Sequence, residues 1–590
     1  MSDEIRDEPL GEDELDHTAT DEVRWEPASD VPDDADGPAA APAVPERADE
    51  PRRKPTGREV AVVAGRTTAG VVVAAIAAGV AFGSTFFVPP TWSATAPSLA
   101  AVPTAAPQQL VCPGGLLRLA TDTGEGASTA SPIGAPWTAW AADTSVALRD
   151  IAGTNAGTLG TPAAAEIGTV AVADSGAPSA AGLQTEIVAA GIDGLAAAAC
   201  AAPASEQWLV AGATTLGRTS LLILTNPSAV EAVVDIELYS EDGRVAAAGL
   251  SGVRLAPDEQ RVLPLNGFAV DIVAPVIRVV SSGGRVVAAV QQSIVRSLAT
   301  GGVDVVAAQR PATSLVIPGV RAQARGELAA LDVQEIDHDD ISTVLRLFAP
   351  GATEVTATVA IFPEGATLAE ALAVDETVDA EAPGDAHADH EGEDADEPEP
   401  YSIRLTLTPG LVTEHVLELL PAGDYTIVVA AEQPIVGAVR NSTLAAGAAG
   451  AAPRVDFAWA SPAAPLADRA VLALPRLADG TGGVPGVAAS APAQPTTTPP
   501  GGAFLGYLLW LVNPGDTAAT ATVTIEGEAP RSVELAPGSA AWVQLPAEST
   551  VALDGVRGLS AALLVVGPGL NAQAPLQPPA QLASEVVVRF

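Results

Sequence analysis

Residues that commonly carry catalysis are scarce in this chain of 590 residues. Its five histidines are His17, His338, His387, His390 and His415. The sequence contains no G-x-S-x-G turn, no Walker motif, no G-x-G-x-x-G after a strand and no C-x-x-C. His387 and His390 stand among carboxylates that suit a divalent cation, but no rigid framework holds them in place. We therefore expect no enzyme activity, no cofactor and no specific metal site.

The two cysteines, Cys112 in "LVCPGG" and Cys200 in "AAAACAAP", suit a disulfide better than they suit chemistry. No histidine lies between them to complete a metal site, and neither has a neighbouring histidine or basic residue to activate its thiol. In an oxidising compartment the two can pair. A bridge across a loop of this length stabilises a fold by about 4 to 5 kcal/mol in the chain-entropy account. We predict that it ties together the ends of one domain.

The first 90 residues of the chain consist of an acidic tail followed by an apolar span. Residues 1–58 are rich in acids and lack apolar periodicity, which predicts a disordered cytosolic tail. Thr67–Val88 then runs for 22 residues without a charge, enough to cross a hydrocarbon core of about 30 Å. Arginines precede this span, and no positive charge follows it until Arg118. We therefore predict a single transmembrane helix within residues 59–90, with the amino end in the cytoplasm and the rest of the chain outside.

Two alternatives and one exclusion accompany this topology. A cleaved signal peptide is the competing interpretation, because "SATA" after Trp92 resembles a small-residue cleavage site. Gly79 and Gly83 form a G-x-x-x-G pattern that could bring two such helices together. The formal net charge of −43 argues against nucleic acid as a partner, since a polyanion is bound through a basic surface.

The exported part repeats a strand that runs into a turn. "LLILTNPS" from Leu221 and "LLWLVNPG" from Leu508 share an Asn-Pro pair, and "VLRLFAPG" from Val344 keeps the proline without the asparagine. Asn and Pro suit the first two positions of a tight turn. An alternating strand follows each turn, which is typical of antiparallel sheets with one buried face.

A second turn recurs with the same register. It reads "LAPD" at Pro257, "LTPG" at Pro409 and "LAPG" at Pro537, and a leucine follows each proline after eight residues. These leucines are Leu265, Leu417 and Leu545. Short strands separated by turns over roughly 80 to 110 residues predict β-sandwiches of immunoglobulin or fibronectin type. The predicted fold class is mainly β, with tandem sandwiches after the transmembrane helix and the acidic tail.

The resulting domain plan is read from these patterns and from composition. It comprises the tail 1–58, the membrane helix 59–90, a Pro/Ala spacer 91–107, a disulfide-closed β domain 108–205, sandwich copy one 206–320, copy two 336–445, a linker with strand segments 446–500 and copy three 501–590. Copy two carries an acidic insertion, 372–402, that replaces a hairpin loop at little entropic cost. We expect this loop to be disordered.

The chain resembles an uncharacterised family of actinobacterial envelope proteins from the Cys112-Pro113-Gly114 opening through "EQWLVAGATTLGRTSLLILTNPS". The resemblance is good over residues 105–310 and implies an anchored envelope protein without an assigned activity. We expect a non-enzymatic scaffold that holds a rod of sandwiches outward. The alternative is a glycan- or protein-binding module, in which Trp137, Trp140 or Trp459 would stack on sugar rings unless they pack in the core.

Overall fold

The computed structural model contains two compact units, Met1–Ala96 and Pro97–Phe590. It describes residues 70–76, 98–101, 107–119, 130–151, 165–170, 180–188, 192–296, 299–323, 341–374, 398–417, 420–445, 453–477, 505–577 and 586–589. Residues 70–76 are helical, whereas the acidic tail, Gly79, Gly83 and most of the acidic loop lie outside the described residues. Within the part that is described, no helix has the length and apolarity needed to cross a bilayer.

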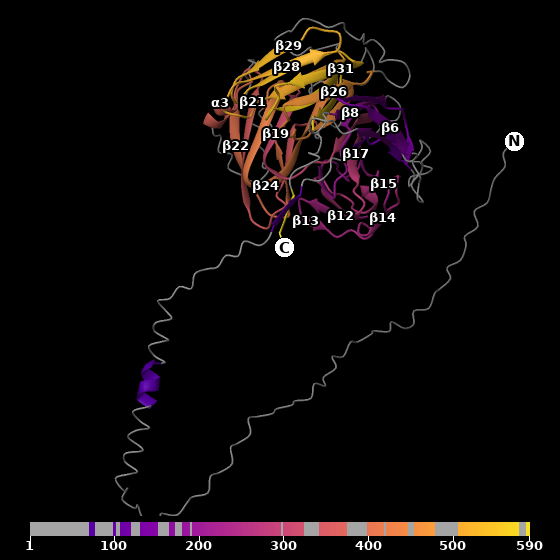
Figure 1. Ribbon diagram of the computed structural model, residues 1–590. Helices are drawn as coiled ribbons and strands as arrows, with labels where there is room; N and C mark the ends of the chain where they lie inside the picture. The colour runs from indigo at the N-terminus through magenta and orange to yellow at the C-terminus, as the bar shows by residue number, and fades with distance from the viewer. Residues whose placement is uncertain are drawn as a thin grey trace, which may run out of the picture. The chain divides into compact units, whose positions relative to one another are not determined.

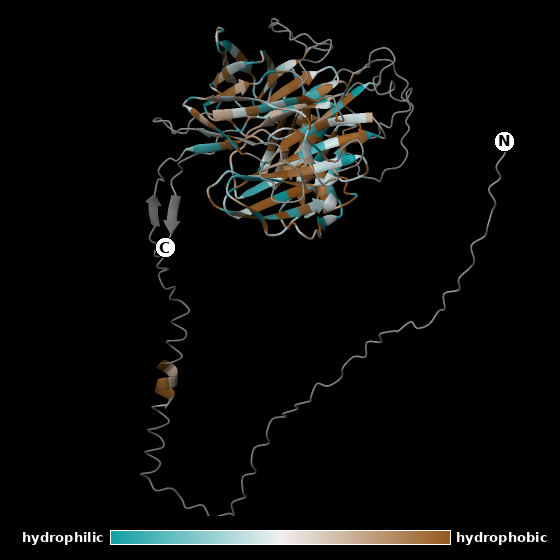
Figure 2. Ribbon diagram, turned by 90° about the vertical axis from the view of Figure 1, so that its right-hand side faces the viewer, coloured by the Kyte–Doolittle hydropathy of each residue, from teal (hydrophilic) through white to brown (hydrophobic). Residues whose placement is uncertain are grey.

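The second unit is mainly β, as the sequence predicts, and its strands form several antiparallel sheets. Figure 1 shows the strands of successive chain segments in different parts of one globule, and Figure 2 shows hydrophobic and hydrophilic residues alternating along many of them. We divide the strands into an N-module (107–200) and modules 1 (206–307), 2 (312–460) and 3 (469–575). Modules 1 to 3 contain the three copies of the sequence repeat.

Each of modules 1 to 3 contains two sheets with the same strand order. If the main strands of a module are lettered a to h along the chain, one sheet runs a-f-c-d and the other e-b-g-h. In module 1 these are β10 (Glu206–Val210), β11 (Arg218–Asn226), β12 (Ala232–Ser240), β14 (Val253–Leu255), β15 (Glu259–Pro264), β16 (Val276–Gly283), β17 (Val287–Arg296) and β18 (Ala299–Ala307), with β13 (Gly243–Val245) beside β12 and the short 3-10 helix η1 (Leu265–Gly267) after β15.

Modules 2 and 3 repeat this order with one local change. Module 2 uses β19 (Ala312–Ala322), β20 (Val344–Phe348), β21 (Val355–Pro363), β22 (Tyr401–Leu407), β23 (Val412–Val416), β24 (Gly423–Ala445) and β25 (Arg454–Ala460), and α3 (Leu368–Ala373) follows β21. The long strand β24 supplies both f and g, because its first part pairs with β21 and its second part with β20. Module 3 uses β26 (Arg469–Leu474), β27 (Gly506–Val512), β28 (Ala519–Ile525), β29 (Arg531–Leu535), β30 (Ala540–Leu545), β31 (Ser549–Asp554), β32 (Ser560–Gly567) and β33 (Leu570–Pro575).

The N-module follows the same order in a reduced form. Its strands are β2 (Gln108–Val111), β3 (Leu117–Leu119), β4 (Ala130–Pro132), β5 (Trp137–Ala142), β6 (Val146–Ile151), β7 (Ala165–Val170), β8 (Ala180–Val188) and β9 (Gly194–Ala199). The orders β2-β7-β6 and β5-β8-β9 correspond to a-f-c and b-g-h, and β3 pairs with β4 as an addition. Outside the modules, β1 (Ser98–Ala101) pairs with β34 (Val586–Arg589). The sequence did not predict that the disulfide domain is a fourth version of the repeat.

The two recurring turns lie together because the asparagine of the first holds the second. The side-chain N–H groups of Asn226 donate to the carbonyl oxygens of Val230 at 2.8 Å and Ala256 at 3.0 Å. Asn513 does the same in module 3, donating to the carbonyls of Thr517 at 2.8 Å and Ala536 at 3.1 Å. In module 2 the buried Ala349 stands at this position, so this module forms the same strands without the asparagine clamp.

The second turn has the same backbone in all three copies. After its proline comes a residue with positive φ, Asp258 at 55°, Gly410 at 76° and Gly538 at 66°. Proline followed by positive φ defines a type II turn. The leucines at the shared spacing are buried, with Leu265 0%, Leu417 5% and Leu545 2% exposed.

Strand h of every module lies at the edge of its sheet, and these four edges meet. Strand β9 contacts β18, β18 contacts β25, β25 contacts β33, and β33 contacts β9. An edge strand exposes unpaired backbone groups and must be covered. Here each edge is covered by the edges of its two neighbours, so the modules form a closed ring instead of the rod that we expected.

Candidate binding cleft and the contacts that hold it

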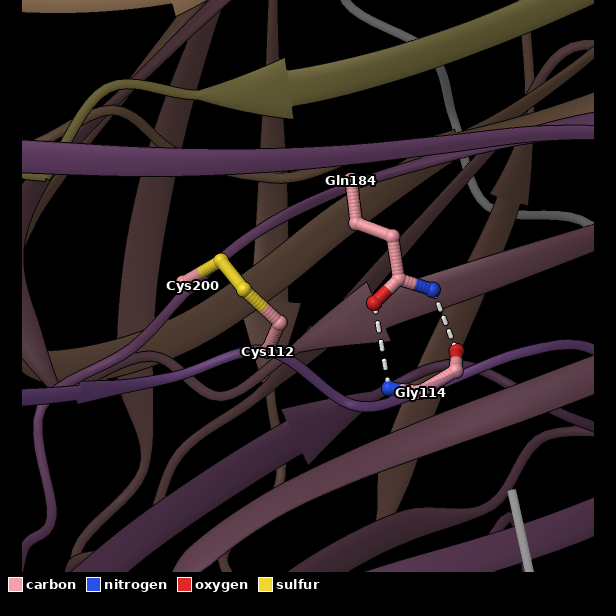
Figure 3. Close-up of a disulfide and its surroundings, with 4 residues drawn as sticks. All are labelled: Cys112, Gly114, Gln184 and Cys200. Atoms are coloured by element: carbon pink, nitrogen blue, oxygen red, sulfur yellow. Dashed lines mark hydrogen bonds between the residues drawn. A yellow bond between two sulfur atoms is a disulfide. The ribbon is translucent and has the colours of Figure 1, made fainter. Parts of the chain in front are cut away.

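The predicted disulfide is present. Cys112 follows β2 and Cys200 follows β9, and their sulfur atoms are bonded. Beside them the amide of Gln184 bonds both backbone groups of Gly114, accepting from its N–H at 3.1 Å and donating to its carbonyl (Figure 3). The bridge therefore joins the first and last strands of the N-module, where the chain passes into module 1.

Asp456 of β25 connects the four strands that meet at the centre of the ring. We call these strands, β9, β18, β25 and β33, the central strands. Its carboxylate accepts backbone N–H groups from Leu195 of β9 at 2.9 Å, Val303 of β18 at 3.2 Å and Asn571 of β33 at 3.3 Å. The neighbouring Asp304 of β18 accepts the backbone N–H of Trp459 in β25 at 2.7 Å. The two carboxylates thus accept backbone N–H groups of edge strands, which would bond to carbonyls of a further strand if the sheets continued.

Burial dominates the electrostatics of these acids. It raises the pKa of Asp304 to about 7, against the smaller effect of the N–H groups of Trp459 and Val305. Burial likewise raises the pKa of Asp456 well above its usual range. In the N-module, burial raises the pKa of Glu186 to about 7, although this side chain accepts the N–H of Leu116. Both central acids are fully enclosed and serve as structural links.

A buried arginine fixes module 2 against module 1. The guanidinium of Arg346 in β20 donates to the carbonyls of Gly212 at 3.0 Å and Pro275 at 2.9 Å, both in module 1. It also pairs with Glu414 at 2.7 Å, and its side chain is 1% exposed. Its guanidinium carbon lies 4.5 Å from the ring centre of Trp459, a distance that permits a cation–π contact.

A cleft of about 590 Å³ opens where the four central strands end. Much of its wall is built from four segments at the ends of β9, β18, β25 and β33, which are 199–204, 308–312, 462–467 and 574–577. Residues 180–183 of β8 and 469–473 of β26 also line it. Sites for small molecules occur preferentially where domains meet and typically have volumes of roughly 300 to 1,000 Å³. The cleft is therefore our candidate functional site.

The residues that the sequence suggested for sugar stacking lie elsewhere. Trp459 is 1% exposed and belongs to a hydrophobic core that modules 1 and 2 share. Trp140 packs its ring against the glycines 168 and 182, where a side chain on either would collide with it. Trp137 is 41% exposed, with Arg476 at 5.5 Å from its ring centre. None of the three lines the cleft.

His415, the one histidine in the described part of the chain, also lies apart from the cleft. It lies in β23 opposite Leu345 in the ladder. The other four histidines lie outside the described residues. Within the described ranges, no three side chains of His, Cys, Asp or Glu are grouped closely enough to hold a metal ion.

Sequence reasoning missed the central acids, the buried arginine and the cleft. A signal for the acids existed, because "GVDVV" and "RVDFAW" each place one aspartate inside an apolar strand. Such a residue is rarely buried unless the fold provides partners. The cleft left no comparable signal, since it is formed by alanine- and proline-rich segments that read as linkers.

Comparison with known proteins identifies the family but no activity. The model of a family of unknown function, DUF5719, matches residues 156–397 and 376–503. No curated protein and no solved structure is similar to the chain. Because the matched residues make up more than half of the sequence, the chain belongs to this family of unknown function, DUF5719.

Proposed function

We propose that the protein is a non-enzymatic, membrane-anchored scaffold on the outer side of the membrane of a bacterial cell envelope. The uncharged span Thr67–Val88 with arginines before it supports the anchor and its orientation. The Cys112–Cys200 disulfide supports an oxidising compartment for the second unit.

The observation that carries the scaffolding role is the locking of four modules into one ring. A scaffold must keep its surfaces in fixed relative positions, and independent domains on linkers do not. Here Asp456 bonds to three neighbouring strands, and Arg346 is enclosed by carbonyls of the next module. The indole N–H of Trp510 in module 3 donates to Thr426 of module 2 at 3.0 Å, within an apolar cluster shared by both modules.

We also propose that each pair of sheets is a β-sandwich related to the immunoglobulin arrangement. Residues of both sheets form one core in each of modules 1, 2 and 3. The b–e and c–f pairs correspond to the B–E and C–F pairs of immunoglobulin domains. The first, fourth and seventh strands depart from that arrangement, because a pairs with f, d pairs with c and g pairs with b.

The anchor and the scaffold are tested in two steps in cells that carry the full chain. Protease added to wall-stripped cells should digest residues beyond about 92 and leave a tag at Met1 intact. Digestion of the tag would refute the orientation. Cross-linking followed by mass spectrometry should then recover envelope proteins or polysaccharide on modules 1 to 3 above the level obtained with residues 1–96 alone. Recovery equal to that control would refute the scaffold.

A binding module for glycan or protein is the second candidate, and the observation that favours it is the ring of Trp137, which is 41% exposed. A glycan array probed with the full chain separates the two candidates. A specific glycan signal would favour the binding module over a purely structural role. The signal should depend on Trp137 if ring stacking carries it, because Trp140 and Trp459 are occupied by packing.

A further inference from the structure

The chemistry of the cleft wall is aliphatic. Apart from eight polar side chains, every described residue that lines it is Ala, Cys, Gly, Leu, Pro or Val, and none of these described residues is aromatic. Sugars and bases are usually held by stacking on aromatic side chains, so this wall does not suit them. A flexible hydrocarbon chain needs only apolar contact, and each methylene that it buries raises affinity about fourfold.

The polar groups in the deeper wall are already used by the protein. Gln207 donates to the carbonyl of Val286 at 2.8 Å and accepts the N–H of Ala288 at 3.1 Å. Gln309 bonds both backbone groups of Gly437, at 2.9 and 3.1 Å. These amides offer little to a polar ligand. Ser314 and Gln577 also line the cleft, and the remaining uncharged lining residues are apolar.

Most charges around the cleft are also balanced. Arg469 pairs with Asp143 at 3.0 Å and Asp554 at 2.6 Å. Glu206 pairs with Arg278 at 2.9 Å.

Two further arginines line the cleft. Arg557 lies 3.8 Å from Asp468. Arg310 is exposed, and among the described residues it has no ion-pair partner. Among the described arginines that line the cleft, Arg310 is therefore the one whose positive charge has no carboxylate beside it.

We propose that the cleft binds a single-chain anionic amphiphile, a fatty acid whose hydrocarbon chain lies against the alanine- and proline-rich segments and whose carboxylate meets Arg310. The hydrocarbon chain packs against the apolar wall, and the negative charge of the carboxylate complements the guanidinium of Arg310. This inference goes beyond the scaffold proposal and does not depend on it, because a scaffold whose cleft binds nothing is still a scaffold.

Photo-crosslinking in the full, membrane-inserted chain tests the proposal. The probe is palmitate that carries a diazirine near its methyl end, and labelled peptides are mapped by mass spectrometry. We expect labels to concentrate in the stretches that line the cleft, and excess palmitate to remove them. These stretches are 180–183, 199–204, 308–312, 462–467, 469–473 and 574–577. Labels spread over the surface, or absent from these segments, would overturn the proposal.

Two filling variants and one matched control establish that the label comes from the cleft. Ala464→Trp and Ala202→Trp place a large side chain at half-buried positions in the segments that form the wall, and each should reduce labelling at least tenfold. Val270→Trp adds the same side chain at a position that is 70% exposed and away from the cleft, and it should leave labelling unchanged. Thermal unfolding of each variant confirms folding. If both folded filling variants labelled like the control, the cleft would not be the site.

The charge is tested separately. Arg310→Gln should weaken competition by palmitate about three- to tenfold, whereas competition by hexadecanol, which lacks the carboxylate, should be unchanged. Equal competition by both compounds against the wild type, with no effect of Arg310→Gln, would overturn the assignment of an anionic ligand. A glycan-array signal that Ala464→Trp abolishes, without any lipid label, would show that the cleft serves a different ligand.

Discussion

Replacing Arg346 with methionine should weaken the contact between modules 1 and 2 more than any surface substitution. Methionine keeps an unbranched apolar side chain but removes every N–H donor. The change leaves the carbonyls of Gly212, Pro275 and Val273 without their donor, and these bonds are 3.0, 2.9 and 3.2 Å long. It also leaves Glu414, whose side chain is 24% exposed, without its partner at 2.7 Å.

The expected cost follows from these contacts. Hydrogen bonds to a charged group contribute about 1.5 to 3 kcal/mol each, and removal of one member of a buried ion pair costs about 3 to 5 kcal/mol. Part of the loss is regained, because the desolvation of the guanidinium disappears. We expect the free energy of unfolding to fall by about 3 to 5 kcal/mol for Arg346→Met. Arg346→Lys should lose somewhat less, since an ammonium keeps the charge but lacks the planar fork.

Urea denaturation of the full chain, followed by tryptophan fluorescence, measures this effect. Trp208 and Trp459 report on the contact directly, because the ring of Trp208 lies 5.6 Å from Phe348 and Trp459 lies under Arg346. The matched control is Arg285→Met in module 1, where the side chain is exposed; it should change stability by less than about 0.5 kcal/mol. If Arg346→Met changed the unfolding transition no more than this control, the hydrogen bonds from Arg346 to the three carbonyls would not stabilise the contact between modules 1 and 2. Our claim that this arginine fixes the two modules would then be wrong.

Three further predictions concern the ring and the repeat. The pKa of Asp304 is raised to about 7 by burial, so the folded state retains a proton that the unfolded state releases near pH 4. Asp304 alone should therefore contribute about 2 to 3 kcal/mol to a decline in stability between pH 5 and pH 7, and Glu186 and Asp456, whose pKa values burial also raises, should add to that decline. A urea midpoint that shows the same pH slope in Asp304→Asn would contradict this. Asn513→Ala removes the donors for three carbonyls and should lower the free energy of unfolding by about 2 to 4 kcal/mol, measured by heat or urea. Asn226→Ala should have the same effect. No loss in either variant would show that the asparagine clamp is dispensable, as it is in module 2. Joint replacement of Cys112 and Cys200 by serine should cost about 2 to 5 kcal/mol, while the wild type should show no maleimide-reactive thiol and no covalent dimer on a non-reducing gel.

Features encoded by local sequence could be predicted well. The turn at Pro257, with Asp258 at positive φ, recurs at Pro409 and Pro537, where Gly410 and Gly538 have positive φ. The eight-residue spacing to Leu265 keeps its register because a side chain that shifts by one position in a strand moves to the opposite face. The disulfide followed from the scarcity of cysteine and from the absence of partners for any other use.

Features that depend on contacts between modules could not be predicted in the same way. Asp456 binds N–H groups that lie 261, 153 and 115 residues away in the chain, and no local pattern specifies such distances. The fourth module escaped detection because its β5 and β6 lack the Asn-Pro turn and only its strand order reveals the relationship. The cleft depends on how four segments converge, whereas each segment alone has the composition of a linker.

The hydrogen bonds of Asp456 also determine when, during folding, the ring of modules can close. The partners of Asp456 come from early, middle and late parts of the chain, and the last of them, Asn571, lies in β33. Long-range pairings of this kind form slowly, because the intervening chain must be ordered before they contribute. During synthesis the first three modules can collapse one after another, but β9 and β25 stay open on one side until module 3 emerges. A chain that stops before Leu570 should therefore leave β9 and β25 uncovered on that side and be prone to aggregation through those edges.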